Sequence, residues 1–158
     1  MADVAEPEGR KIIVAVDDGE ESIGDHCGQT SSGARDTLVL VYARPTPPLF
    51  SAMDGTGVLF SEEITASLVK YSRDLADSVM EKAQNICKNH SNVKVEVKVT
   101  IGDARDVICT TVDRIKADIL VMGSHGYGFI KRAFIGSVSD YCSKNAKCPV
   151  IIVKRPAV

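Results

Sequence analysis

The sequence predicts an α/β protein built on a doubly wound sheet of five parallel strands. Short runs of Val, Ile and Leu alternate along the chain with segments of helical periodicity. Strands that are buried on both faces have this continuous apolar composition. The connections between the elements are short, which is typical of a sheet with helices on both faces. With 158 residues, of which 44% are hydrophobic, the chain has enough material for one core.

Four of the predicted strands are buried, and the fifth has a different pattern. The buried strands are Lys11 to Asp17, Thr37 to Tyr42, Asp118 to Met122 and Pro149 to Val153. In the fifth strand a polar residue follows each of four valines, which are Val93, Val95, Val97 and Val99. Strict alternation indicates one solvated face, so this strand is expected at an edge of the sheet.

Three helices are predicted from apolar positions that recur every three or four residues. The longest runs from Ser61, its cap, to His90, and a second begins at Asp103. The third runs from Ser137 to about Lys147, and Pro149 prevents its continuation.

Two other segments do not fit the alternation of strands and helices. Arg44 to Phe60 is rich in proline and glycine, and is predicted to form a long loop over one end of the sheet. Residues 22–36 stand where the first crossover helix belongs, but their glycines make them a poor helix former. We therefore predict a degenerate crossover over 22–36, which is the segment that we expect to be most mobile after the N-terminal tail.

The predicted organisation is one domain over residues 11–158, preceded by a disordered tail over residues 1–10. The tail is acidic and has no apolar core, so it is not expected to be a secretory signal. A net charge of −2 favours neither nucleic acid nor an anionic membrane surface as a partner. No apolar run approaches the roughly 20 residues of a membrane span. We expect a cytoplasmic protein, with nuclear entry left open.

The five cysteines indicate free thiols in a reducing compartment rather than a metal site. They have an odd count and no paired spacing, at Cys27, Cys87, Cys109, Cys142 and Cys148. The simplest interpretation of each is a small buried apolar residue.

The segment after the strand that ends at Met122 has the chemistry of a phosphate site. Its first part is Gly123, Ser124, His125 and Gly126, and after Lys131-Arg132 a helix begins at Gly136, Ser137, Val138 and Ser139. Glycines let the backbone approach a polyanion, and amides and hydroxyls at a helix start can donate to phosphates. The alternative is purely structural, because Ser137 to Asp140 also has the spacing of a capping box.

Asp17 follows the first strand and would face the same crevice if that strand neighbours the one that ends at Gly123. Ligands of open α/β sheets bind beyond the carboxyl ends of the strands, where the strand order reverses. A carboxylate there suits ribose hydroxyls. Asp17 can equally be a turn residue before Gly19.

Several enzyme classes find no support in the sequence. It contains no GxxxxGK[ST] loop and no GxGxxG after the first strand, so neither a Walker-type NTPase nor a dinucleotide fold is predicted. Histidine side chains in general titrate near neutrality, but the sequence places no partner residue beside His125 for catalysis. We therefore predict a binding protein and not an enzyme.

The spacing Gly123-x2-Gly126-x9-Gly136-Ser137 resembles the ATP-binding signature of the universal stress protein family. The likeness extends from the first strand with Val16-Asp17 to the last strand. It implies an adenine nucleotide alpha hydrolase-like sheet of order 3-2-1-4-5. It also implies ATP, with or without Mg²⁺, at the switch between the first and fourth strands.

Carried over to this sequence, the resemblance assigns roles to eleven residues. It places Ala15 and Asp17 against adenine and ribose, and Ala43 against the adenine. The phosphate and ribose side would be Gly123, Ser124, His125 and Gly126, and the donors to the phosphates would be Gly136, Ser137, Val138 and Ser139.

The resemblance implies an ATP-binding regulatory module of the stress response. The alternatives are a nucleotide-independent dimeric scaffold and a slow ATP hydrolase. The uniformly apolar strand Val150 to Val153 is expected at a sheet edge, where it would pair with the same strand of a second copy to give a homodimer.

Overall fold

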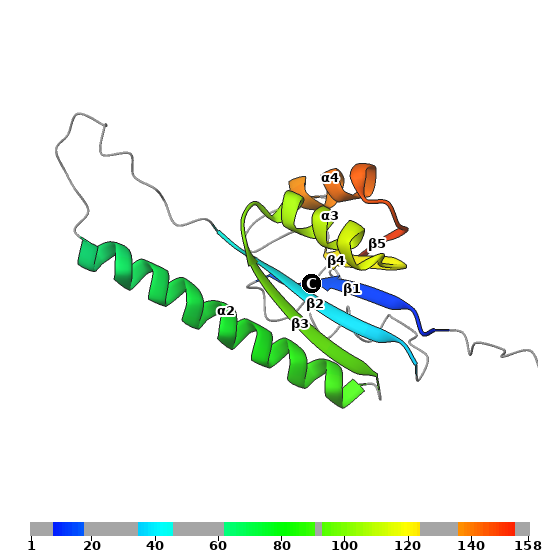
Figure 1. The fold of residues 1–158 in the computed structure, drawn as a ribbon, viewed down its shortest axis with the longest axis horizontal. Helices are drawn as coiled ribbons and strands as arrows, with labels where there is room; N and C mark the ends of the chain where they lie inside the picture. Colours follow the sequence, from blue (N-terminus) through cyan, green and yellow to red (C-terminus); the bar gives the residue numbers. More distant parts are fainter. Residues whose placement is uncertain (1–7, 18–34, 46–61, 91–92, 124–135, 154–158) are drawn as a thin grey trace, which may run out of the picture.

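A computed structural model describes residues 8–17, 35–45, 62–90, 93–123 and 136–153. These residues contain a sheet of five parallel strands in the order β3-β2-β1-β4-β5 (Figure 1). The strands are β1 (Lys11–Ala15), β2 (Thr37–Arg44), β3 (Lys94–Ile101), β4 (Ile119–Gly123) and β5 (Val150–Val153). Both the fold class and the predicted strand order are confirmed.

The central strand β1 is buried on both faces, as its apolar sequence predicts. It pairs with β2 on one side and with β4 on the other, with Ala15 opposite Val41 and Val14 opposite Val121. Its side chains alternate between two core clusters, because successive residues of a strand point to opposite faces. The edge position of β3, which the valine alternation predicts, is confirmed.

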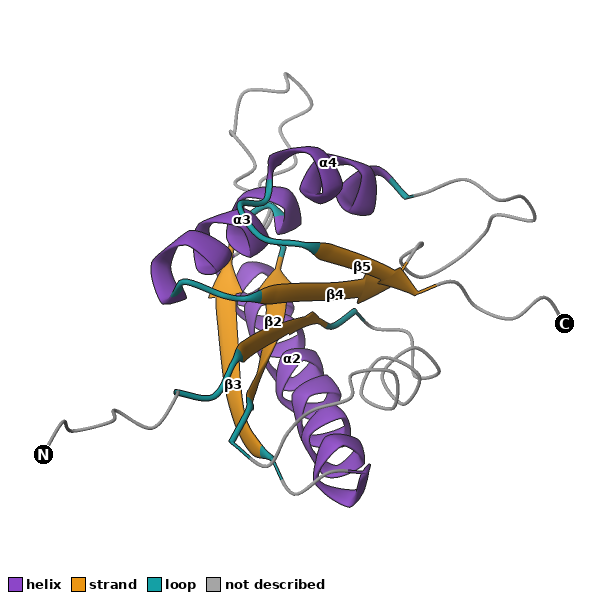
Figure 2. Cartoon of the chain, turned by 90° about the vertical axis from the view of Figure 1, so that its right-hand side faces the viewer, coloured by secondary structure: helices purple, strands orange, loops and turns teal. Residues whose placement is uncertain are grey.

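Helix α2 (Glu62–His90) covers one face of the sheet, and α3 (Ala104–Ile115) and α4 (Ser137–Asn145) cover the other (Figures 1 and 2). The core contacts of α2 come from its second half, through Ala76, Val79, Met80, Ala83 and Cys87. Its first turns extend past the sheet, so that Tyr71 of the predicted apolar stripe is 68% exposed. Helical periodicity predicts the helix, but it does not predict how much of the helix packs against the sheet.

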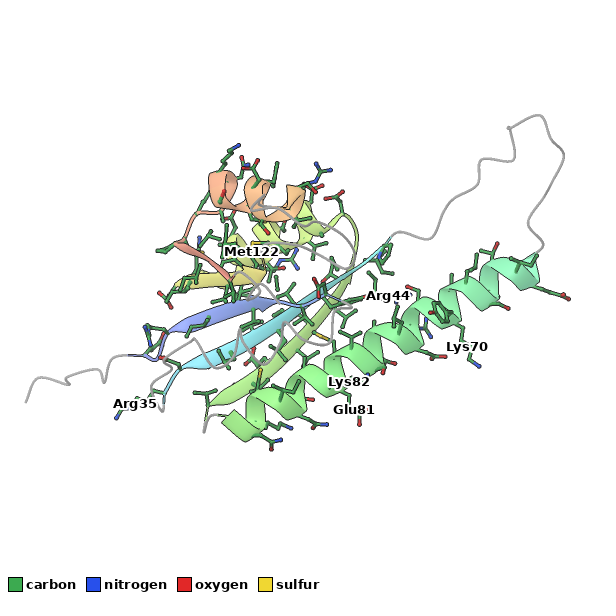
Figure 3. All side chains as sticks on the ribbon, turned by 180° about the vertical axis from the view of Figure 1, so that it is seen from behind. Arg35, Arg44, Lys70, Glu81, Lys82 and Met122 are labelled. Atoms are coloured by element: carbon green, nitrogen blue, oxygen red, sulfur yellow. The ribbon has the colours of Figure 1, made fainter. Side chains whose placement is uncertain are left out.

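Two strand ends differ from the prediction. β1 ends at Ala15 and not at Asp17, although the Val16 amide still donates to the Val41 carbonyl (2.9 Å). β2 continues to Arg44, which was predicted to begin a loop. Arg44 is only 8% exposed and donates to Ser72 Oγ (3.3 Å) and to the Val69 carbonyl (3.5 Å) of α2, so it lies between sheet and helix (Figure 3).

Several predictions fall on residues outside the described ranges. These are the tail over residues 1–7, most of the crossover at 22–36 and most of the loop at 44–60. At the borders, Arg10 forms an ion pair with the buried Asp36 (2.7 Å).

The cysteines agree only in part with the prediction of free thiols. Cys109, Cys142 and Cys148 are free, whereas Cys87 is disulfide-bonded, which corrects the prediction for that residue. Cys27 lies outside the described residues. Among the described helices, none has the length and apolar character needed to cross a membrane.

Candidate functional site

The candidate site lies at the edge of the sheet where β1 and β4 end. The chain leaves β1 toward β2 on one side and later returns through β4 on the other, so the strand order reverses between these two strands. In such sheets this reversal opens a crevice beyond the strand ends. Asp17 follows β1 and Gly123 ends β4, so the order 3-2-1-4-5 brings both to the same edge.

Helix α4 begins at this edge with a glycine cap. Gly136 has extended backbone angles (φ −60°, ψ 158°) and supplies no side-chain hydrogen bond to the helix start. The first amide to bond back is that of Asp140, to the Gly136 carbonyl (2.9 Å). The capping box predicted as an alternative is therefore not formed, and the Asp140 carboxylate instead pairs with Lys144 (2.9 Å). Within the part of the chain that the structure describes, no side chain caps the first-turn amides, which can then donate to an anion.

Ser139 connects the start of α4 to the end of β4. Its hydroxyl donates to the main-chain carbonyl of Gly123, and the residue is only 3% exposed. Sequence reasoning expected this hydroxyl to donate to phosphates. In the structure it is already used, so the amide of Ser139 is the group that can face a ligand, together with the exposed Ser137.

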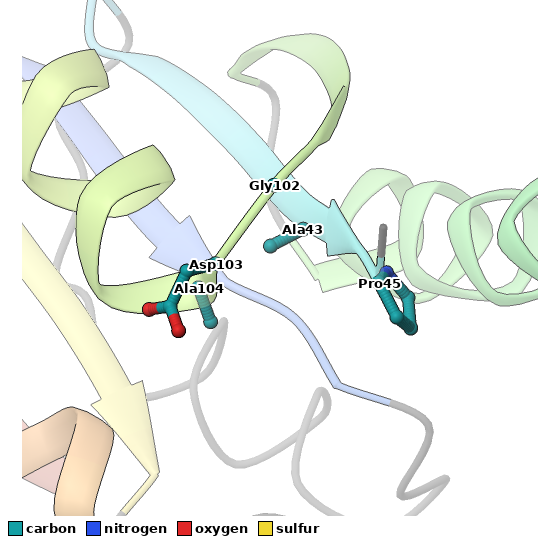
Figure 4. A pocket seen from close by; sticks show the side chains of 5 residues that line it. All are labelled: Ala43, Pro45, Gly102, Asp103 and Ala104. Atoms are coloured by element: carbon teal, nitrogen blue, oxygen red, sulfur yellow. The ribbon is translucent and has the colours of Figure 1, made fainter. Parts of the chain in front are cut away.

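A hollow of about 360 Å³ lies farther along the same edge, beside the ends of β2 and β3. It is lined by Ala43, Pro45, Gly102, Asp103 and Ala104 (Figure 4). Ala43 and Ala15 both pack against the core cluster on the α3 side of the sheet. Because these side chains are small, they leave room for a flat ring at the strand ends.

The turn from β3 into α3 requires its glycine. Gly102 has a φ of +152°, which residues with a side chain rarely adopt. A β-carbon there would also lie 3.1 Å from Cγ2 of Val107. The conformation turns the chain sharply at the floor of the hollow.

Asp103 is the cap of α3 and carries the negative charge of the hollow. Its carboxylate accepts from the Arg105 amide (2.9 Å) and from the Arg105 guanidinium (3.1 and 3.2 Å). The hydrogen bond from the Arg105 side chain, followed by that from its amide, lowers the pKa of Asp103. The guanidinium carbon of Arg105 also lies 5.7 Å from the centre of the Tyr141 ring on α4, within the range of a cation–π contact.

The structure thus brings most of the predicted site residues to one edge of the sheet. They are Ala15, Asp17, Ala43, Gly123, Gly136, Ser137, Val138 and Ser139. Ser124, His125 and Gly126 lie outside the described residues, as do Lys131 and Arg132. Sequence reasoning missed the hollow and its Asp103. The pair Gly102-Asp103 directly before a helix could have indicated a functional turn. The hollow itself could not be predicted, because it depends on how the ends of β2 and β3 lie beside each other.

Within the described ranges, no cluster of three or more His, Cys, Asp or Glu residues could hold a metal ion. Two separate carboxylates at the described edge are acceptors, and its hydrogen-bond donors are amides and hydroxyls. This set suits hydrogen bonding to an organic anion.

The sequence model of the universal stress protein family matches residues 9–154, which is most of the chain. The chain belongs to the universal stress protein family. The match runs from the start of β1 through the glycine-serine signature to the end of β5.

Several relatives of this universal stress protein come from Arabidopsis thaliana. The universal stress protein PHOS32 is 32% identical over 162 aligned residues, which cover 93% of this chain and 65% of the relative. The universal stress protein A-like protein is 46% identical over 65 residues, or 41% of this chain and 37% of the relative. The chain therefore spans less than two thirds of the length of these relatives.

Solved structures of the family share this fold. A universal stress protein family protein from Arabidopsis thaliana, solved with AMP bound, is 23% identical and has a TM-score of 0.65. The match covers 94% of this chain and 93% of that one. A universal stress protein in complex with cAMP is 19% identical with a TM-score of 0.65, covering 95% of this chain and 100% of that one. At these identities the likeness establishes the fold.

Proposed function

We propose that this universal stress protein is a regulatory module that binds an adenine nucleotide, ATP in the first place, along the edge where β1 and β4 end. The phosphates lie at the start of α4 and the base lies toward the hollow beside Ala43. The relatives solved with AMP and with cAMP support an adenine nucleotide as the class of ligand.

The attachment of α4 to β4 carries the proposal. Gly136 leaves the first-turn amides without a side-chain cap, and the hydrogen bond from Ser139 to Gly123 holds these amides next to the strand end. The positive end of a helix dipole and its unused amides form a site for an anion. Three such amides, at Ser137, Val138 and Ser139, match the several oxygens of a phosphate group.

The charges along the edge support one orientation of the ligand. The carboxylate of Asp103 at the hollow already caps α3 and pairs with Arg105, so it offers phosphates no donor, whereas the start of α4 presents amides to them. An uncharged base therefore suits the hollow and the small side chains of Ala15 and Ala43. Asp17, between the two ends, is the expected acceptor for the ribose hydroxyls.

Binding without rapid turnover is the expected activity. Rapid phosphoryl transfer needs a group that orients the attacking nucleophile, and usually metal ions on the phosphates. Neither requirement is supplied by the amides and hydroxyls of the signature, so any Mg²⁺ would be carried by the nucleotide. We expect a turnover number below about 1 s⁻¹, the lower end of the ordinary enzyme range.

The proposed assembly is a homodimer through β5. This strand is an edge of the sheet, and Ile151 on it is 42% exposed. An apolar edge strand is a template for pairing with another strand.

The experiment is a calorimetric titration of ATP, AMP and cAMP into the wild type and two variants. Gly136→Val adds a branched side chain where the backbone faces the anion, so it should abolish the heat of ATP binding. Ser143→Ala is the matched control, because Ser143 lies on the exposed side of the same helix, where it donates to the Asp140 carbonyl. Micromolar binding by the wild type and the control alone supports the proposal. Equal binding by all three proteins, or by none, contradicts it and favours a nucleotide-independent scaffold.

A further inference from the structure

Two thiols from neighbouring helices face each other inside the core on the α3 and α4 side. The Cys109 thiol of α3 donates to Sγ of Cys142 of α4 at a distance of 3.8 Å. The helices lie side by side on one face of the sheet (Figures 1 and 2). Both cysteines are free, and neither belongs to the nucleotide site described above.

The two sulfurs differ in their access to solvent. Cys142 is completely buried, and burial, followed by the neighbouring Cys109, raises the pKa of its thiol to about 12. Cys109 is only partly buried. A small oxidant from solvent would therefore reach Cys109 first. The sulfur of the buried Cys142 lies in contact with that of Cys109. This is the arrangement of an attacked thiol and a resolving thiol.

We propose that Cys109 and Cys142 form a peroxide-sensitive dithiol that closes into a disulfide and thereby links α3 to α4. Cys109 gives up its proton, its thiolate attacks the terminal oxygen of a hydroperoxide and the O–O bond breaks. Cys109 becomes a sulfenic acid, and the leaving oxygen takes up the released proton and departs as an alcohol or water. The Cys142 sulfur then attacks the sulfur of Cys109, and the sulfenic hydroxyl leaves as water with the Cys142 proton. Two thiols are oxidised and one peroxide is reduced.

The geometry requires only a local closure. A disulfide has an S–S distance of about 2.05 Å, so the two sulfurs must approach by roughly 1.7 Å from their separation of 3.8 Å. Side-chain rotation together with a small shift of one helix can supply this movement. Among the described residues, Cys142 supplies the sulfur that lies in contact with that of Cys109.

Cys148 is the competing thiol. It is free and partly buried, and the charge of Cys109 contributes to the raised pKa of its thiol, after burial and Asp118. Within the described ranges, Cys109 forms a hydrogen bond to Cys142 and none to Cys148. The predicted partner of Cys109 is therefore Cys142 and not Cys148.

The disulfide would also act on the nucleotide site, an expectation that rests on the proposed function. Cys142 lies one helical turn after Ser139, whose hydrogen bond to Gly123 fixes the start of α4. Drawing Cys142 toward α3 displaces the same rigid helix. We expect oxidised protein to bind ATP at least about fivefold more weakly, the lower end of typical couplings between sites.

The test is peptide mapping of the native protein after treatment with stoichiometric hydrogen peroxide and blocking of free thiols. A peptide linked through Cys109 and Cys142, absent before oxidation and lost on reduction, is the expected result. Mapping assigns each linkage separately, so the bond at Cys87 is not counted. Overoxidised Cys109 with Cys142 still free, or a bond from Cys109 to Cys148, overturns the proposal.

Two variants separate the parts of the inference. Cys148→Ser should still form the linked peptide, whereas Cys109→Ser should leave Cys142 reduced at the same peroxide dose. ATP titrations of reduced and oxidised wild type then test the coupling. If the disulfide forms but reduced protein binds no nucleotide, the proposed function fails while the dithiol stands. Equal ATP affinity of both forms refutes the coupling alone.

Discussion

The hydroxyl of Ser139 donates a hydrogen bond to the main-chain carbonyl of Gly123, so the first turn of α4 is attached to the last residue of β4. These two residues are the ends of the segment that carries the glycine-serine signature. Their contact sets the position of the helix start relative to the strand end, and the distance between these two elements decides whether a phosphate fits.

Replacing Ser139 by alanine should therefore weaken the fold as well as the site. The partly buried Gly123 carbonyl loses its donor, and the loss of a hydrogen bond costs about 0.5 to 1.5 kcal/mol. Urea denaturation of Ser139→Ala should show a free energy of unfolding lower by this amount. The control Ser143→Ala, on an exposed position of α4, should change it by less than about 0.5 kcal/mol. Equal losses in both variants would show that the Ser139 contact has no special role.

Gly102→Ala tests the turn at the floor of the hollow. Its φ of +152° and the nearby Cγ2 of Val107 oppose any side chain. A residue forced into such a conformation costs about 1 to 3 kcal/mol, whereas alanine at an unstrained glycine usually stabilises a protein. Thermal denaturation should show a lower Tm for the variant. An unchanged or higher Tm would mean that the turn does not need a glycine.

The cap at Asp103 predicts a pH dependence of stability. The hydrogen bonds from Arg105 lower the pKa of Asp103 in the folded protein. A carboxylate with a depressed pKa stabilises the folded state above its unfolded pKa, about 3.9, and this contribution is lost as the pH falls through the folded pKa. Asp103→Asn keeps a capping oxygen but does not titrate.

The denaturation midpoints of the wild type and Asp103→Asn should therefore differ at pH 7, with the wild type more stable. The difference should shrink as the pH falls below about 4. A difference that stays constant between pH 7 and pH 3 would show that the charge of Asp103 contributes nothing.

Ile151→Lys tests the proposed dimer. Ile151 is exposed on the edge strand β5, while its neighbour Ile152 packs against the core. A lysine at position 151 therefore adds a charge to the edge without disturbing the fold, and two copies would face each other across a two-fold axis. Light scattering should find a dimer for the wild type and a monomer for the variant. A monomeric wild type at tens of micromolar contradicts the assembly.

The sequence predicted the sheet well because its signals are local. Continuous apolar runs identify parallel strands, and the valine alternation placed β3 at an edge. The site was predicted from a spacing of glycines and serines, but the use of the Ser139 hydroxyl was not. That hydrogen bond depends on the distance between Gly123 and α4, which is set by the tertiary structure and not by local sequence.

Other features were missed for the same physical reason. The burial of Arg44 follows from its contact with α2, a helix that begins many residues later. The contact between Cys109 and Cys142 joins residues 33 positions apart. No local pattern of apolar or polar residues encodes such pairs, since they form only after the helices have docked on the sheet.

Amide hydrogen exchange with and without saturating ATP tests the central claim most directly, because it reports both binding and its location. We predict that ATP slows exchange at the first-turn amides of α4, at Gly123 and in the turn around Asp103, and leaves the second half of α2 unchanged. No protection at the start of α4, or protection confined to α2, would contradict a nucleotide site at the edge where β1 and β4 end.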